Sequence, residues 1–167
     1  MDEQLGMYIN KKLKAVYFLL IKMGAIKEDA EDIIQETAIQ FVQYLDTIQE
    51  DYIDAWLFRV AINKYYDSLR KRKYKDKYVN SVKIEDLLDW TTPEDIMIKN
   101  ELHTMLSECL GKIPQKDAEL LLLKYCGELT LKDIAIIYGT TDKSIKTMLV
   151  RAKKKVRKVI EEVQRFG

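Results

Sequence analysis

The chain has 167 residues, of which 47% are hydrophobic and 33% are charged, and its formal net charge is +1. These values are typical of a globular protein with one domain or two small ones, and the near-neutral total does not by itself indicate a nucleic-acid binder. The sequence contains no cationic leader and no apolar run of about 18 residues, so we expect a cytoplasmic protein without direct membrane insertion.

Metal and cofactor chemistry has few residues to use. His103 is the only histidine, and the two cysteines, Cys109 and Cys126, are isolated within apolar patterns. A zinc hydrolase needs several histidines, and a di-iron bundle needs paired Glu-x-x-His motifs. No glycine-rich phosphate loop occurs either. We therefore expect no metal, no cofactor and no catalytic residue, and a structural role for both cysteines.

The charges are segregated along the chain. Residues 1–79 are balanced, residues 80–100 are mainly acidic, and residues 101–167 are mainly basic. Any affinity for nucleic acid is therefore expected to be local to the basic C-terminal part.

The first predicted helix covers residues 3–23, where apolar side chains recur at steps of three and four. This spacing is typical of one amphipathic helix, and Gly24 is expected to end it. The apolar residues are Leu5, Ile9, Leu13, Val16, Leu20 and Met23.

The second predicted helix, about residues 28–45, has a clear apolar stripe and an acidic, amide-rich opposite face. The helix dipole favours negative charge near the helix start, which accounts for the acids up to Asp32 but less well for Gln35 and Glu36. The stripe consists of Ala30, Ile33, Ile34, Thr37, Ala38, Phe41, Val42 and Leu45.

A loop over about residues 46–51 precedes the third predicted helix, residues 54–73. It ends in four consecutive cations from Arg70 to Lys73, more than the helix dipole requires. These three helices predict a compact domain over residues 1–77. The core-facing residues of the third helix are Trp56, Leu57, Val60, Ala61 and Leu69, and its outer surface carries Arg59, Asn63, Lys64, Asp67 and Arg70.

Residues 78–91 are short, mixed and acidic, and they predict a linker. Residues 92–95, Thr-Pro-Glu-Asp, then predict a new helix start with proline in the first turn. A helix to about Leu110, a break at Pro114 and an apolar run over residues 118–125 follow. The predicted fold is therefore all-α, with two small helical domains joined by a linker, and the second domain covers residues 92–167.

Residues 130–158 predict a helix-turn-helix. Thr130 and Asp133 have capping-box spacing, so a helix can begin at Leu131, and Gly139 can end it. No acid occurs between Asp142 and Glu161, and the resulting polar face suits a phosphate-lined major groove. A lysine-rich helical hairpin can also be merely a solvated surface. The face carries Lys143, Ser144, Lys146, Thr147, Arg151 and Lys154.

Three motifs in order resemble an extracytoplasmic-function (ECF) group sigma factor of the sigma-70 family, the small bacterial RNA polymerase specificity subunits. The core-binding part of region 2 is matched by DAEDIIQET, residues 29–37. Its promoter-melting pattern WLxxIAxNxxxDxxRxxxR is matched by WLFRVAINKYYDSLRKRK, residues 56–73. Region 4 is matched by residues 113–156. The resemblance covers nearly the whole chain.

The resemblance implies two sets of contacts for region 2. Asp32, Gln35 and Glu36 match the family's contacts to the clamp helices of the polymerase largest subunit. Asn63 matches a position that helps to hold a minus 10 base flipped out of the duplex, and Ile48 lies in the preceding loop. An asparagine can meet a base edge bidentately, which offsets the cost of unstacking. The strand backbone would be followed by Arg59, Lys64, Arg70 and Arg72.

In region 4, the resemblance implies that the polar face of the second helix reads the minus 35 element and its phosphates. Lysine stands at position 146, where arginine is commoner, so the planar fork that reads guanine bidentately is lost. Val150 can contact a thymine methyl or simply pack. The residues matched to the recognition helix are Lys146, Thr147, Val150 and Arg151, with Lys143, Ser144 and Lys154 on the same surface.

The implied function is non-enzymatic, and the implied partners are bacterial core RNA polymerase, promoter DNA and an anti-sigma factor that is often membrane-bound in this family. One alternative is a stand-alone helix-turn-helix transcription regulator, with residues 1–79 as an effector or dimerisation domain. A remote alternative is an enzyme that uses the carboxylates of the second helix. It is disfavoured because no His, Cys or Ser partner is placed nearby.

Overall fold

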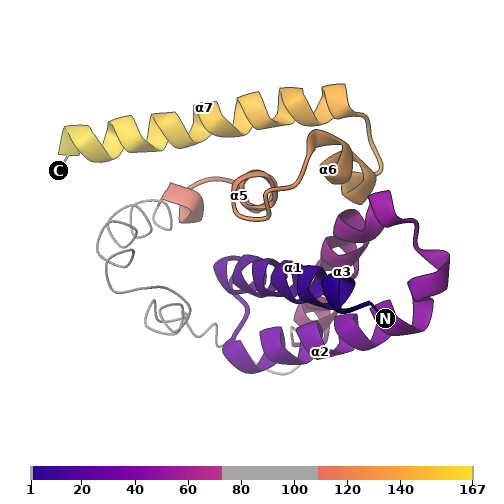
Figure 1. Ribbon diagram of the computed structural model, residues 1–167. Helices are drawn as coiled ribbons and strands as arrows, with labels where there is room; N and C mark the ends of the chain where they lie inside the picture. The colour runs from indigo at the N-terminus through magenta and orange to yellow at the C-terminus, as the bar shows by residue number, and fades with distance from the viewer. Residues whose placement is uncertain (1, 73–108, 167) are drawn as a thin grey trace. The chain divides into compact units, whose positions relative to one another are not determined.

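The computed structural model describes residues 2–72 and 109–166, and within these ranges every regular element is helical. The chain divides into two compact units, one built mainly on α1 to α3 and the other mainly on α5 to α7 (Figure 1). The all-α prediction is therefore confirmed. The predicted linker, residues 78–91, and the predicted helix start at 92–95 lie outside the described residues.

The N-terminal unit is a three-helix domain of α1 (Glu3–Lys22), α2 (Lys27–Tyr44) and α3 (Ile53–Arg72), in which each helix packs against the other two. α1 ends as predicted, because Gly24 has a φ of 103°, a conformation that favours glycine. Two short 3-10 turns, η1 (Leu45–Thr47) and η2 (Glu50–Tyr52), connect α2 to α3.

A hydrophobic cluster in the core of this unit forms where α1 and the C-terminal part of α2 meet the start of α3. The Phe41 ring meets the Trp56 ring edge-on, with 5.9 Å between their centroids. Trp56 itself is only partly buried, so it closes the core at its margin. The fully enclosed members of the cluster are Ile9, Leu13, Phe41, Ile53 and Leu57.

One residue of the predicted α2 stripe is misplaced. Val42 was expected in the core but is 59% exposed. Successive residues of a helix are about 100° apart, so Val42 is turned well away from the buried Phe41. The apolar stripe of α2 is therefore narrower than the sequence suggested.

The buried face of α3 is wider than predicted. Phe58, Ile62 and Tyr65 are buried, although none was assigned to the core. α3 packs against both α1 and α2, so it needs apolar side chains over more than one stripe. Val60 and Leu69, which were assigned to the core, are only partly buried.

The C-terminal unit is built on α5 (Gln115–Tyr125), most of α6 (Leu131–Tyr138) and α7 (Asp142–Phe166). Four consecutive leucines, residues 120–123, are buried, so α5 is apolar on nearly every side and serves as the central helix. It packs beneath α7, and Figure 1 shows it nearly end-on. Lys155 of α7 forms an ion pair with Asp117 of α5 at 2.7 Å.

Tyr65 ties α3 to the turn that follows α1. Its hydroxyl donates a hydrogen bond of 3.1 Å to the carbonyl oxygen of Met23. Burial raises the pKa of Tyr65, the carboxylate of Asp29 raises it further, and the guanidinium of Arg72 lowers it. The folded protein therefore favours the protonated phenol.

We predict that Tyr65→Phe lowers the free energy of unfolding by about 1 kcal/mol at neutral pH, because the Met23 carbonyl loses its donor. The raised pKa also means that the parent loses stability once the unfolded tyrosine ionises above about pH 10. The variant lacks this loss at position 65, so the gap between the two proteins should shrink above about pH 10. Urea unfolding at neutral and alkaline pH measures both effects. A gap that widens with pH would contradict this account.

Candidate nucleic-acid interface

The outer face of α2 presents the three residues matched to polymerase contacts. Asp32, Gln35 and Glu36 are all exposed, and they lie away from the buried side of the helix. Ile39 is also exposed, two turns beyond Asp32 on the same side. The surface therefore changes from acidic to apolar toward the C-terminal end of α2.

Two ion pairs join this acidic face to the cations of α3. Lys64 Nζ lies 3.0 Å from a carboxylate oxygen of Glu36, and Arg72 pairs with Asp29. The Lys64 side chain is only 23% exposed, whereas that of Glu36 is 61% exposed. Residues that sequence analysis assigned to polymerase and to DNA are thus in direct contact.

A shallow groove of about 290 Å³ runs between α2 and α3 where these ion pairs form. Sequence analysis missed several of its residues, because they come from two helices whose relative register is set by packing. The groove is lined by Asp29, Asp32, Ile33, Glu36, Lys64, Asp67, Ser68 and Lys71.

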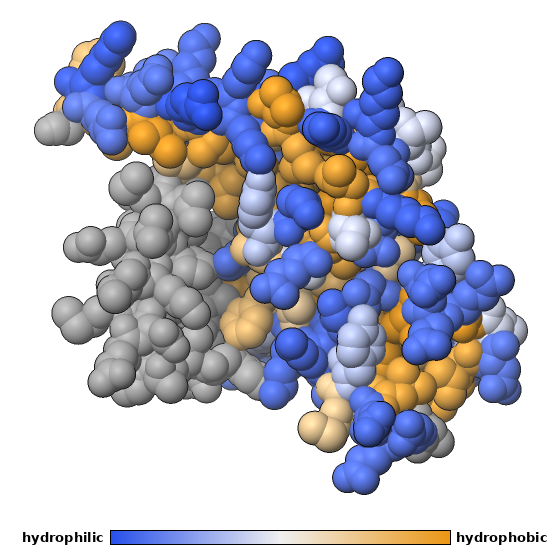
Figure 2. Space-filling view, turned by 45° about the horizontal axis from the view of Figure 1, so that its top comes forward, coloured by the Kyte–Doolittle hydropathy of each residue, from blue (hydrophilic) through white to orange (hydrophobic). Residues whose placement is uncertain are grey.

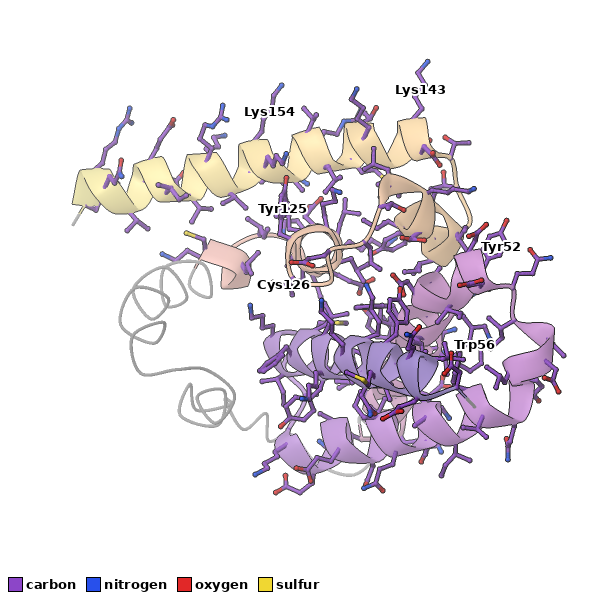
Figure 3. The ribbon with its side chains drawn as sticks, viewed as in Figure 1. Tyr52, Trp56, Tyr125, Cys126, Lys143 and Lys154 are labelled. Carbon is purple, nitrogen blue, oxygen red and sulfur yellow. The ribbon has the colours of Figure 1, made fainter. Side chains whose placement is uncertain are left out.

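A second hollow, a wide-open depression of about 470 Å³ that is called the cavity below, lies at the connection between α2 and α3. Ile48, which was predicted as a DNA contact, lines it. Four further lining residues were missed, since a loop without periodicity gives no signal for which side chains converge. Tyr52 ends η2 and Trp56 lies in the first turn of α3 (Figure 3), and both line the cavity. The lining residues are Thr47, Ile48, Gln49, Tyr52 and Trp56.

Asn63 and Arg59 are exposed on α3 but do not line this cavity. Asn63 is seven residues beyond Trp56, about 10 Å along the helix and on the same face. Arg70 is exposed as well and pairs with Asp67 at 2.7 Å. Arg59, Asn63 and Arg70 therefore form a strip along α3 with the cavity at its N-terminal end. Lys64 and Arg72 do not belong to this strip, because they turn toward α2 and pair with Glu36 and Asp29.

The helix-turn-helix has the predicted local structure. Thr130 and Asp133 form both reciprocal bonds of a capping box, each at 3.1 Å from backbone nitrogen to side-chain oxygen. α6 then begins at Leu131, and Gly139, with a φ of 65°, ends it. Thr141 caps α7 by accepting a 3.2 Å hydrogen bond from the backbone nitrogen of Ser144.

Most of the predicted minus 35 residues are exposed along α7. Ser144 is only partly buried and accepts a 3.0 Å hydrogen bond from the Thr141 hydroxyl, and the Thr147 hydroxyl donates to the Lys143 carbonyl at 3.1 Å. Both hydroxyls therefore serve the helix itself. Figure 3 shows Lys143 and Lys154 on the same side of α7, away from α5. The exposed members are Lys143, Lys146, Thr147, Val150, Arg151 and Lys154.

In residues 2–72 and 109–166, no three His, Cys, Asp or Glu side chains are grouped so that they could hold a metal ion. Nor is any helix in these ranges long and apolar enough to cross a membrane.

Comparison with known proteins identifies the family. The model of Sigma-70 region 2 matches residues 9–74, and that of Sigma-70, region 4 matches residues 103–156. RNA polymerase sigma factor SigV of Bacillus subtilis (strain 168) is 30% identical over 78% of this chain and 75% of its own length. The chain belongs to the sigma-70 family, in its ECF group. ECF RNA polymerase sigma factor SigW of the same organism is 29% identical over 89% of this chain and 84% of its own length.

Solved structures show the same fold for this sigma factor. The sigma factor RpoE, in complex with the anti-sigma factor NepR from Bartonella quintana, matches with a TM-score of 0.71 at 20% identity, over 96% of this chain and 98% of that one. CnrH, in complex with the cytosolic domain of CnrY, matches with a TM-score of 0.65 at 19% identity, over 94% and 87%.

This sigma factor is an RNA polymerase subunit for transcription initiation and not an enzyme. The match to both regions, in the family's order, leaves no support for a stand-alone regulator or for a carboxylate-based enzyme.

Proposed function

We propose that this sigma factor joins bacterial core RNA polymerase in the cytoplasm, places α7 on the minus 35 duplex and captures an unpaired minus 10 base with its region 2 domain. The family match carries this proposal, and the exposed residue sets support it. Residues 1–77 would form the region 2 domain and residues 92–167 the region 4 domain, with residues 78–91 between them. The polymerase performs the chemistry.

The polymerase surface is centred on Asp32. This carboxylate is exposed and forms no ion pair in the part of the chain that the structure describes, so it is free for a basic partner. Glu36 already pairs with Lys64, so a partner must compete for it. The exposed Ile39 extends the surface with apolar area, which is typical of the centre of an interface.

The minus 10 base enters the cavity beside Ile48. The cavity has a volume of about 470 Å³, which is within the range of roughly 300–1,000 Å³ for small-ligand pockets. Tyr52 is 39% exposed and can stack on a base, and an aromatic stack contributes about 1–3 kcal/mol. Because Asn63 lies about 10 Å further along α3, it meets a neighbouring nucleotide of the same strand. Arg59 and Lys64 then contact the strand's phosphates.

The minus 35 element is read by the first turns of α7. Lys146 and Val150 are exposed one turn apart, and they can reach base edges while Lys143, Arg151 and Lys154 contact phosphates.

An anti-sigma factor is the expected regulator. One solved neighbour is the sigma factor RpoE in complex with the anti-sigma factor NepR, and another is CnrH in complex with the cytosolic domain of CnrY. A protein of that kind, soluble or membrane-bound, would inhibit this chain by covering the α2 face that core polymerase needs.

The polymerase surface predicts a separation of folding from binding. Asp32→Arg should change the free energy of unfolding by only about 0.5 kcal/mol, because the site is exposed. It should weaken association with core polymerase at least tenfold, since a reversed interface charge costs several kcal/mol and about 1.4 kcal/mol is tenfold. Circular dichroism melts and a titration against core polymerase measure the two effects.

Glu31→Arg is the matched control, because it makes the same charge change about 100° around α2. Glu36 is left unchanged in this experiment, because Glu36→Arg would place a new cation opposite Lys64 and disturb the contact between α2 and α3. A folded Asp32→Arg variant that binds core polymerase as tightly as the parent would remove the assignment of this face.

The cavity predicts a defect in promoter melting. Tyr52→Ala and Asn63→Ala should each slow open-complex formation about tenfold or more while closed-complex affinity stays nearly unchanged, because an extruded base exists only after the strands separate. Permanganate reactivity and closed-complex affinity are measured on the same promoter. Tyr44→Ala, an exposed aromatic outside the cavity, is the control. Normal melting by Tyr52→Ala would show that the cavity takes no base.

Substitutions on the α7 surface should have two different effects, one on the preference for minus 35 sequences and one on the overall affinity for DNA. Lys146→Ala should change which minus 35 sequences are used, because a base contact discriminates by about 1–3 kcal/mol at one position. Lys154→Ala should weaken binding to all minus 35 sequences alike. It should also lower the slope of log affinity against log salt concentration by about one unit. Transcription from a randomised minus 35 library separates them. Identical sequence profiles for both variants would show that Lys146 reads no base.

A further inference from the structure

The basic face of α7 continues well beyond the residues that match the recognition positions. α7 has 25 residues, and no acid occurs between Asp142 and Glu161. Arg157 and Lys158 are exposed within this interval. At about 1.5 Å per residue, Lys158 lies about 22 Å beyond Lys143 along the helix axis.

Arg157 and Lys158, the distal cations, lie on the same side of α7 as Lys143 and Lys154. Arg157 and Lys158 follow Lys154 by three and four residues, the spacing of neighbours on one helix face. Leu149 and Ala152 are buried on the opposite side. Figure 2 shows hydrophilic side chains along the outside of α7 and hydrophobic ones beneath it.

Lys153 and Lys155, at the flanks of this face, contact side chains of α5. The Lys153 ammonium lies 5.2 Å from the centroid of the Tyr125 ring, and Lys155 pairs with Asp117. Both are therefore directed toward α5. Arg157 and Lys158 form no ion pair with any described residue, so their charges remain available to a partner.

The arrangement is unfavourable for a helix that faces only water. Arg151, Lys154 and Lys158 are spaced three and four residues apart, and like charges at these spacings repel. A helix that faces only water usually has both positive and negative side chains at these spacings, as α2 does with Lys27 and Glu31. A bound polyanion would remove this repulsion, because phosphates neutralise the cations.

We propose that α7 lies lengthwise against promoter DNA and that Arg157 and Lys158 form a second phosphate-binding zone beyond the bases that are read. This inference rests on the proposed minus 35 contact. The major groove is only about 12 Å wide, so a basic face about 22 Å long extends past the groove onto the phosphates that border it. These contacts add affinity that is independent of sequence, and Glu161 marks where they end.

The test uses the full chain assembled with core polymerase and a promoter duplex, with affinity measured over a range of salt concentrations. Arg157→Gln with Lys158→Gln should lower the slope of log affinity against log salt by nearly two units, about one for each phosphate contact. Affinity should fall equally for matched and scrambled minus 35 sequences. Lys153→Gln with Lys155→Gln, which removes the same charge from the flanks, should leave the slope unchanged.

A second variant tests the proposal in the opposite direction. Glu161→Gln removes a repulsive charge from the end of the same face and should tighten binding about two-fold or more at low salt. If the distal pair leaves slope and affinity unchanged while Lys154→Ala lowers both, α7 meets DNA only with its first turns, and the proposal is overturned. Loss of core association by the distal variant, with DNA contacts intact, would also overturn it in favour of an acidic protein partner. Failure of the parent chain to engage core polymerase or promoter would instead refute the proposed function.

Discussion

The packing of α2 against α3 fixes how the side chains of these two helices lie relative to one another in the N-terminal unit. Phe41 and Leu57 are buried at this contact, and the Phe41 ring meets Trp56 edge-on. Burial of such side chains contributes about 1.5–3 kcal/mol each, whereas an exposed ion pair contributes about 0–1 kcal/mol. The pairs of Glu36 with Lys64 and of Asp29 with Arg72 therefore result from the helix register and do not create it.

That register brings Asp32 and Glu36 of the proposed polymerase surface and Lys64 of the proposed DNA surface to one groove. A carboxylate matched to polymerase contacts already neutralises a lysine matched to DNA contacts. Binding of a basic partner to Glu36 would leave Lys64 without its counter-charge, so the two contacts are energetically linked. The C-terminal unit lacks this arrangement on α7, where the flanking lysines pair with α5 and the outer cations stay unpaired among the described residues.

Within residues 2–72 and 109–166, local sequence signals predicted the helices and their ends well, because these depend on neighbouring residues. Thr130 with Asp133 and the two glycines at positions 24 and 139 ended or began helices where expected. Signals that depend on tertiary packing were weaker. Val42 was assigned to the core because it fits a three-four spacing, yet it is 59% exposed. The cavity beside Ile48 was not foreseen, since an irregular connection brings its side chains together and no periodicity reports that convergence.

If this sigma factor gives core RNA polymerase its choice of promoter, its addition must change where transcription starts. The most direct measurement maps the 5′ ends of transcripts made on genomic DNA by purified core polymerase, with and without the purified chain. We expect a discrete set of new start sites that share a minus 10 and a minus 35 element and that appear only when the chain is added. An unchanged pattern of start sites, despite a folded chain in excess over core polymerase, would contradict it.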